Sequence, residues 1–150
     1  SFYDTAKSKC GLVVHFNKRA NLLALMYQSR AIQANSKLTP LRDAQHIVPP
    51  ADYQVPRALE AMGLIQYSDA LKNKIFERKN LAYGSQAEVE IRAANVVVMC
   101  ALLEGINRQR NSCKPSQKEI MMCELDSFMW FMGRTIKTGL PHHLTKTTAY

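Results

Sequence analysis

The sequence predicts an all-α domain, with at most a small hairpin at its front. Two capping boxes, Ser85-Gln86-Ala87-Glu88 and Ser116-Gln117-Lys118-Glu119, indicate helix starts, because Ser and Glu at this spacing satisfy exposed backbone donors reciprocally. Apolar residues recur at helical spacing in several further stretches. The 150 residues, 47% of them hydrophobic, fit a single domain over 1–150 with a core of its own.

The front of the chain predicts a hairpin followed by a long helix. A β-branched run at 12–16 follows a turn rich in Lys and Gly, which is typical of short extended pieces. From Asn17 the pattern becomes helical and is expected to continue to about Asn35-Ser36. The broad apolar face of this helix comprises Ala20, Leu22, Leu23, Met26 and Tyr27.

Three shorter helices are expected in the middle of the chain. Thr at the N-cap and Pro at the first helical position predict a short helix over 39–46. After an extended break at Pro49-Pro50, residues 57–62 predict one or two helical turns closed by Gly63. A further helix is expected over 68–78, with three inward residues: Leu71, Ile75 and Phe76.

Two long helices are expected to complete the domain. The first runs from Ser85 to about Asn107, and the second opens at Ser116 after a polar loop at 111–115. The first helix carries its apolar face on Val89, Ala93, Val96, Val97, Cys100, Leu103 and Ile106. The second is rich in Met and aromatic residues, interpreted as core: Ile120, Met121, Cys123, Leu125, Phe128, Met129, Phe131 and Met132. The tail over 139–150 is predicted to be extended.

Composition narrows the classes of function. The net charge of +8 favours acidic partners. The basic residues are spread along the chain rather than clustered, so we expect no direct nucleic-acid partner. A basic, RNA-associated protein remains an alternative that only the charge supports. The longest apolar run, Val96 to Leu103, is too short to cross a bilayer. The four cysteines form no C-x-x-C pair, so we predict neither a metal site nor another cofactor.

The chain begins at Ser1, without an initiator methionine. Together with a pI near 9.5 and unpaired cysteines, this favours an organelle-processed protein, for instance in a mitochondrial complex. A cytoplasmic location is the alternative.

The stretch Ala51-Asp52-Tyr53-Gln54-Val55-Pro56 carries the leading candidate for chemistry. Asp52 lies between the Pro49-Pro50 break and an apolar helical pattern. A carboxylate at such a junction either caps the helix or acts as a general base or an oxocarbenium-stabilising group in glycosyl transfer. Local rules alone favour the cap.

The roles of the other charged residues can each be interpreted in two ways. Lys18, beside Arg19 at a helix start, either holds an anion or is solvated. Glu90 and Arg92 either orient other side chains or lie on a solvated helix face. The His142-His143 pair in the tail is interpreted as surface histidines, since no Cys or carboxylate stands at a spacing suited to a metal.

Several motifs in one order resemble the C-terminal half of the queuosine salvage family, the queuosine 5′-phosphate N-glycosylase/hydrolases. They cover almost the whole chain: Phe2-x-Asp4, Phe16-x-Lys18-Arg19-Ala20, Asp52-Tyr53-Gln54-Val55-Pro56-Arg57-Ala58-Leu59, Gly63-Leu64-x-x-Tyr67-Ser68, Gly84-Ser85-x-x-Glu88-Val89-Glu90-Ile91-Arg92-Ala93, the Trp130 region and Pro141-x-His143. The resemblance implies a fold like that of helix-hairpin-helix DNA glycosylases. It also implies cleavage of the bond between ribose and the queuine base of queuosine 5′-monophosphate.

Carried over residue by residue, the resemblance implies that Asp52 is the carboxylate facing the anomeric carbon, with Lys18 beside it as the second catalytic residue. It assigns substrate binding to four residues: Tyr53, Glu90, Arg92 and His143.

The chain departs from the family pattern at several polar positions. Gln54 stands where the family has Arg, Met26 where it has Asp, and the family's basic pair in the tail is reduced to Leu144 and Lys146. Family members also carry a further segment of comparable length before this point. The leading hypothesis is therefore a truncated, non-catalytic protein that works as an accessory subunit among other chains of a larger assembly. The alternative is an active N-glycosidase (a hydrolase) that binds the queuosine nucleotide.

Overall fold

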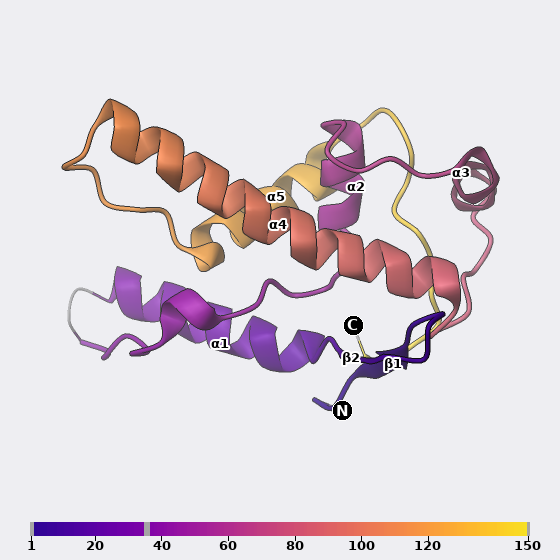
Figure 1. The fold of residues 1–150 in the computed structure, drawn as a ribbon, viewed down its shortest axis with the longest axis horizontal. Helices are drawn as coiled ribbons and strands as arrows, with labels where there is room; N and C mark the ends of the chain where they lie inside the picture. The colour runs from indigo at the N-terminus through magenta and orange to yellow at the C-terminus, as the bar shows by residue number, and fades with distance from the viewer. Residues whose placement is uncertain (1, 35–36, 150) are drawn as a thin grey trace.

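The computed structural model describes residues 2–34 and 37–149 and is mainly helical (Figure 1). At the front, β1 (Thr5–Lys7) pairs antiparallel with β2 (Val13–His15), and Ala6 lies opposite Val14. The helices follow in the order α1 (Lys18–Gln33), the 3₁₀ helix η1 (Ala44–His46), α2 (Val55–Ala61), α3 (Asp69–Phe76), α4 (Gln86–Cys113) and α5 (Met122–Thr135). The helical class and the front hairpin are confirmed. The likeness to helix-hairpin-helix glycosylases stays a prediction.

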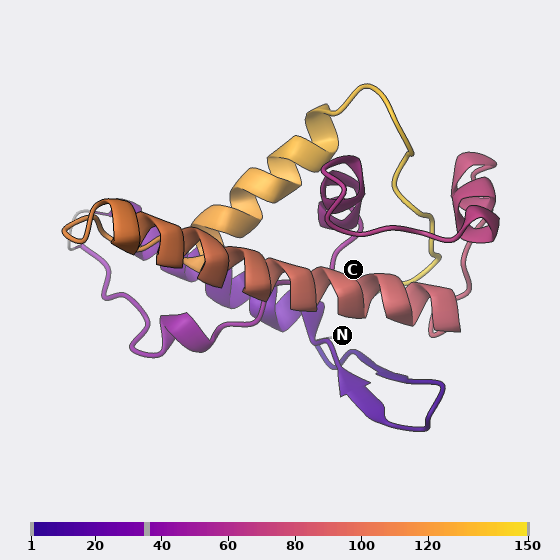
Figure 2. The same ribbon diagram turned by 45° about the horizontal axis from the view of Figure 1, so that its top comes forward.

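The long helix α4 runs the length of the molecule, while the hairpin projects from the helices near the two chain ends (Figures 1 and 2). Helix α5 packs on α1, α2 and α4, and α3 lies to the side (Figure 1). These four packed helices share one core: Leu25, Val55, Ala58, Leu59, Met99, Met122, Cys123, Leu125 and Met129. Within the described residues, no helix is both long and apolar enough to span a membrane.

Helices α2 and α5 approach each other very closely. An added Cβ on Gly133 of α5 would lie 2.2 Å from the backbone oxygen of Gln54, so only glycine fits this crossing. Arg57 of α2 then donates to the exposed carbonyls at the end of α5, with Nη1 2.9 Å from Gly133 O and Nη2 2.7 Å from Ile136 O. Its Nε also donates to Leu140 O at 2.9 Å. One cation therefore ties α2, the end of α5 and the start of the tail together.

The start of α5 differs from the prediction. The helix begins at Met122 rather than at Ser116, and its first turn is capped by Glu124, whose Oε2 accepts from Met121 N at 2.9 Å. The preceding segment is held extended because Asn107 of α4 bonds both the N–H and the carbonyl of Ile120. The predicted capping box at 116–119 is wrong, since a contact distant in sequence decides where the helix starts.

Helix α4 also extends further than expected, to Cys113, so the predicted loop at 111–115 is partly helical. The helix starts at Gln86, as predicted, but the hydrogen bonds at its start differ from those of the predicted capping box. Glu88 Oε2 accepts from Gly84 N at 3.1 Å, and the Ser85 side chain makes no capping bond.

The helix predicted over 39–46 is reduced to η1 (Ala44–His46). Side chains of α1 hold the preceding backbone instead, since Leu41 N donates to Gln28 Oε1 at 2.9 Å and Tyr27 OH donates to Thr39 O at 2.9 Å. Helix α1 ends at Gln33, and the predicted end at Asn35-Ser36 lies outside the described residues.

Several apolar residues expected in the core are exposed instead. Helical spacing placed them correctly on helices, but in the described part of the chain their side chains stay largely exposed to solvent. The exposed set comprises Leu23 (60%), Met26 (61%), Phe76 (73%), Val97 (67%), Phe128 (57%) and Phe131 (59%).

Candidate active site

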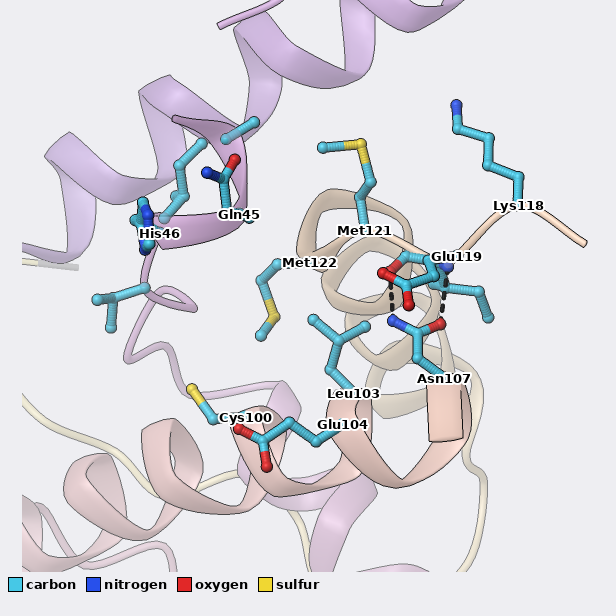
Figure 3. Close-up of a pocket in the computed structure, with 14 residues that line it drawn as sticks. Gln45, His46, Cys100, Leu103, Glu104, Asn107, Lys118, Glu119, Met121 and Met122 are labelled. Carbon is cyan, nitrogen blue, oxygen red and sulfur yellow. Dashed lines mark hydrogen bonds between the residues drawn. The ribbon is translucent and has the colours of Figure 1, made fainter. Parts of the chain in front are cut away.

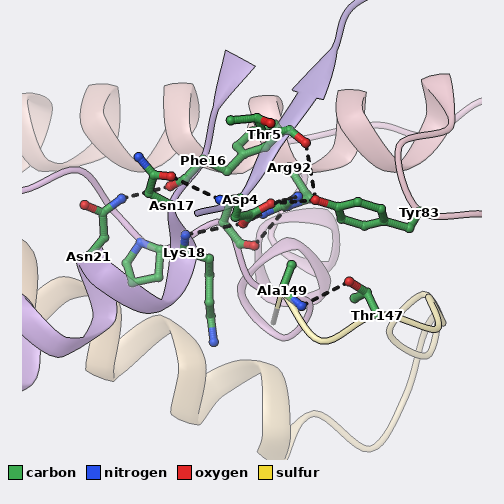
Figure 4. A network of polar contacts seen from close by, with 12 residues as sticks. Asp4, Thr5, Phe16, Asn17, Lys18, Asn21, Tyr83, Arg92, Thr147 and Ala149 are labelled. Carbon is green, nitrogen blue, oxygen red and sulfur yellow. Dashed lines mark hydrogen bonds and ion pairs between the residues drawn. The ribbon is translucent and has the colours of Figure 1, made fainter. Parts of the chain in front are cut away.

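A buried ionic network joins the hairpin to α4 (Figure 4). Arg92 is fully buried and forms an ion pair with Asp4 Oδ2, while its Nη1 lies 3.1 Å from Asp4 Oδ1 and 3.4 Å from Glu88 Oε1. Its guanidinium lies over the Phe16 ring, 4.0 Å from the centroid. The solvated-face reading of Arg92 is therefore wrong. Its Nε donates to Ala51 O at 3.3 Å, which links the network to the residue before Asp52.

Asp4 also sets the start of α1. Its backbone oxygen accepts from Phe16 N and Asn17 N, and Oδ2 accepts from Lys18 N at 3.4 Å. Asn17 adopts a left-handed conformation with φ 44°, which turns the chain from the hairpin into the helix. Lys18 is thus the first residue of α1, and its side chain extends away from Asp4 (Figure 4).

Asp52 is buried at the start of α2, with 4% of its surface exposed. Its Oδ1 accepts from Gln54 N at 2.7 Å and from Val55 N at 2.9 Å, which is the capping role that local rules favour. Oδ2 takes no part in these two bonds. Burial raises the pKa of Asp52, against the opposing effects of the Val55 N–H, the Lys18 charge and the Gln54 N–H.

A second carboxylate, Asp126 of α5, belongs to the same region and was missed from the sequence. It is 9% exposed, and burial, followed by the negative charge of Asp52, raises its pKa to about 7, while Lys18 acts in the opposite direction. The structure therefore brings Asp52, Asp126 and Lys18 together from three segments. The helical spacing could have indicated the burial of Asp126, because this residue follows Met122 by one helical turn and lies on the same buried face of α5.

Tyr53 and His143 line a small cavity of about 150 Å³ with residues of the tail. The Tyr53 ring lies 5.0 Å from that of His142, and Arg78 Nη1 donates to His142 O at 2.9 Å. His143 is only 3% exposed, so the surface reading is wrong for it. Burial lowers the pKa of His143 to about 4, helped by the nearby His142 and Arg92.

Glu90 does not join this group. It is exposed on α4, where its Oε1 accepts from Gln86 Nε2, and it lines a separate cavity of about 220 Å³ with Tyr67 and Ser68. The solvated reading describes its position.

An open groove of about 410 Å³ between α1 and α5 leads to Asp126. Its lining is largely apolar and comprises Leu22, Leu25, Met26, Ser29, Arg30, Gln33, Cys123, Asp126 and Ser127.

Another cavity, of about 430 Å³, lies between η1, α4 and the segment before α5 (Figure 3). Cys100, Glu104 and His46 are among its lining residues, and none of the predicted site residues is. In the described part of the chain, no group of three or more His, Cys, Asp or Glu side chains is arranged to hold a metal ion.

The sequence pattern of the family described as queuosine salvage protein matches the chain over residues 1–150. The chain belongs to the queuosine salvage protein family. It is 30% identical to a queuosine 5′-phosphate N-glycosylase/hydrolase of Sphaerobacter thermophilus over 151 residues, which cover 100% of this chain and 44% of the relative. The protein of the same name from Dictyostelium discoideum is 33% identical over 99% of this chain and 44% of its own length. The Mus musculus protein is 29% identical over 100% of this chain and 44% of its own length.

This queuosine salvage family member thus spans less than half the length of the curated relatives that it matches. The motif at 51–56, one of those on which the resemblance rests, contains Asp52, which is buried and within electrostatic range of Asp126.

Proposed function

We propose that this chain carries the catalytic carboxylates of an N-glycosylase that hydrolyses queuosine 5′-phosphate. The observation that supports this best is the shared burial of Asp52 and Asp126 with Lys18 within electrostatic reach of both. A pair of carboxyl groups in different environments is the usual equipment for cleaving a glycosidic bond. The substrate class follows from the names of the relatives.

In this proposal the two carboxyl groups have different roles. Asp52 acts in its ionised form, which two backbone N–H groups and Lys18 stabilise against the opposing effect of burial, and it faces the positive charge that develops on the ribose carbon. Asp126, with a pKa raised to about 7, carries a proton through a good part of the neutral range and donates it to the departing base. A water molecule then forms the new bond to the ribose carbon, and the proton that it loses restores the carboxyl group of Asp126. Lys18 limits the mutual repulsion of the pair.

The remaining predicted residues divide into three groups. Tyr53 and His143 line the small cavity that adjoins Asp52 along the chain, and we assign substrate binding to them. Arg92 acts as a positioning residue, through its bond to Ala51 O and through Asp4 at the start of α1. Glu90 lies on another cavity and has no role in this proposal.

The test replaces the matched segment of the Sphaerobacter thermophilus relative with this chain and measures queuine released from queuosine 5′-monophosphate. We expect the chimera to turn over and Asp52→Asn to lower the rate by at least about a hundredfold, the scale of losing a group that acts only in the transition state. Asp69→Asn, at an exposed carboxylate on α3, is the matched control and keeps the rate. A folded chimera that releases no queuine, while the parent relative does, contradicts the proposal.

A non-catalytic role as an accessory subunit is the second candidate. One observation favours it: Asp52 caps α2, a structural role that would keep this residue in place without any reaction. The same chimera separates the two, since an accessory chain gives a folded but inactive product. The organelle and the identity of a larger assembly remain predictions.

A further inference from the structure

The hairpin at the front of the chain, which projects from the helices in Figure 2, has one face turned to the core and one turned to solvent. Ala6 lies opposite Val14, and both pack in a small cluster with Phe16, Ala51 and Val89. Successive side chains of a strand point to opposite faces, so the neighbouring pairs share the outer face. These outer pairs are Thr5 with His15 and Lys7 with Val13.

Tyr3 extends the outer face by one further position. It stands two residues before Thr5 and is 71% exposed, and its ring packs edge-on against His15 with the ring centroids 6.0 Å apart. We name this surface the hairpin face and define it by four exposed side chains: Tyr3, Lys7, Val13 and His15. The register and the ring contact make it continuous. Two aromatic rings and a cation therefore share one exposed sheet surface.

The charge around the hairpin face is positive. Asp4 is the only acidic residue among the first 34 of the sequence, and it is buried and paired with Arg92. Lys9 in the turn is exposed, and so is Arg19, whose guanidinium lies 5.8 Å from the centroid of the Phe2 ring. A positive surface that presents aromatic rings complements an anionic partner with flat groups.

The hairpin is held firmly on the body of the protein. The Tyr83 hydroxyl donates to Asp4 Oδ1 at 3.0 Å and lies 3.3 Å from Thr5 O, while Asp4 forms its ion pair with Arg92 of α4. A partner therefore meets side chains whose backbone is already in place, which keeps the entropy cost of binding low.

We propose that the hairpin face binds single-stranded nucleic acid, with bases stacked on Tyr3 and His15 and a backbone phosphate on Lys7. Bases are free to stack on side chains only outside a duplex, and such stacking tolerates any sequence. An acidic peptide would use the lysine but not the rings. The spread of basic residues along the sequence predicted no nucleic-acid partner, whereas the fold sets Lys7 on the same surface as two rings.

This inference goes beyond the proposed hydrolysis, which acts on a mononucleotide. The hairpin face is turned away from the side of the hairpin that packs on Ala51, the residue before Asp52. Binding there requires no reaction at Asp52, so the failure of either proposal leaves the other in place.

The test is fluorescence anisotropy of the purified chain with labelled oligouridine and oligothymidine of about ten nucleotides. We expect Tyr3→Ala to raise the Kd about tenfold, because a stacking ring is lost, and Tyr3→Phe to bind like the wild type. Lys7→Gln should lower the slope of log Kd against log salt by about 0.7, which corresponds to one phosphate contact. Phe76→Ala and Lys74→Gln, at exposed residues of α3, are the matched controls and change neither quantity.

Four results would overturn the inference. The first is no binding at low salt, and the second is the same Kd for Tyr3→Ala and Phe76→Ala, since net charge alone would then explain binding. The third is a tenfold loss on Tyr53→Ala without one on Tyr3→Ala, which would place the strand in the candidate active site. The fourth is binding of vesicles containing phosphatidylserine that Tyr3→Ala abolishes, while the oligonucleotides do not bind, which would assign the hairpin face to a membrane surface.

Discussion

Two buried groups of charges, both in contact with the segment around residue 51, differ in how they are balanced. Around Arg92, two carboxylates face one guanidinium, and all three side chains are fully buried; the hydroxyl of Tyr83, a more exposed residue, donates to Asp4 at 3.0 Å. Around Asp52 and Asp126, two carboxylates face one half-buried lysine, and a groove opens beside them.

The difference lies in where the hydrogen bonds go. Arg92 makes direct hydrogen bonds to Asp4 and Glu88, which fix all three side chains and leave few donors or acceptors for a ligand. Asp126 instead has a pKa raised to about 7, because the cost of burying its negative charge is not offset by an ion pair like that of Arg92. Closed networks of the first kind stabilise a fold, whereas uncompensated groups of the second kind are typical of sites that bind or react.

The largest expected effect comes from breaking the closed group. Arg92→Met leaves Asp4 and Glu88 buried without their cation, and we expect the free energy of unfolding to fall by about 3–5 kcal/mol. Urea denaturation of the purified chain measures it. Arg108→Met, at an exposed arginine of the same helix, should change stability by less than about 0.5 kcal/mol. A loss below about 1 kcal/mol for Arg92→Met would show that the two groups do not differ as described.

An intermediate effect is expected where α5 crosses α2, beside Asp52. Gly133→Ala drives a methyl group into the Gln54 carbonyl and should cost about 3 kcal/mol, because backbone must move. Gly105→Ala is the matched control: its Cβ meets nothing within 4 Å, and the change should stabilise α4 by about 1 kcal/mol. Thermal unfolding followed by circular dichroism gives both values. Equal melting temperatures for the two variants would contradict the close approach of the helices.

The third expected effect is a pH dependence at the open group. A carboxyl group whose folded pKa lies near 7, above its ordinary 3.8, favours the folded state most at low pH, and this contribution is lost as pH rises from about 4 to 7. Asp126→Asn removes the titration, so its stability relative to the wild type should rise by up to about 4 kcal/mol between pH 4 and pH 8. Urea denaturation at both values measures the difference. A constant difference would mean that Asp126 titrates normally.

Local sequence signals predicted the elements that local contacts determine. The starts of α3 and α4 follow from Ser68 and Gly84-Ser85, and Gly63 closes α2 as expected with φ +73°. The start of α5 was missed because Asn107, on another helix, holds Ile120 in an extended conformation. No pattern within the α5 sequence carries that information.

The candidate site was predicted in part for the same reason. Asp52 stood out because the surrounding motif is a local sequence feature, and its cap geometry follows from its position before α2. Asp126 was hidden in an apolar helix, and only the packing of α5 against α1 and α2 brings it near Asp52. The burial of His143 likewise depends on how the tail folds back, since Leu144 O accepts from Leu81 N at 2.7 Å.

The three bonds of Arg57 have a consequence for the energetics of a reaction at this site. Two of them fix the end of α5 to α2 and the third holds the tail, while Asp52 caps α2 and Asp126 lies on α5, so both carboxyl groups belong to one stiff unit. Their separation is therefore set when the protein folds. In the proposed reaction, the reorganisation energy needed to bring the two carboxyl groups into position would therefore be small.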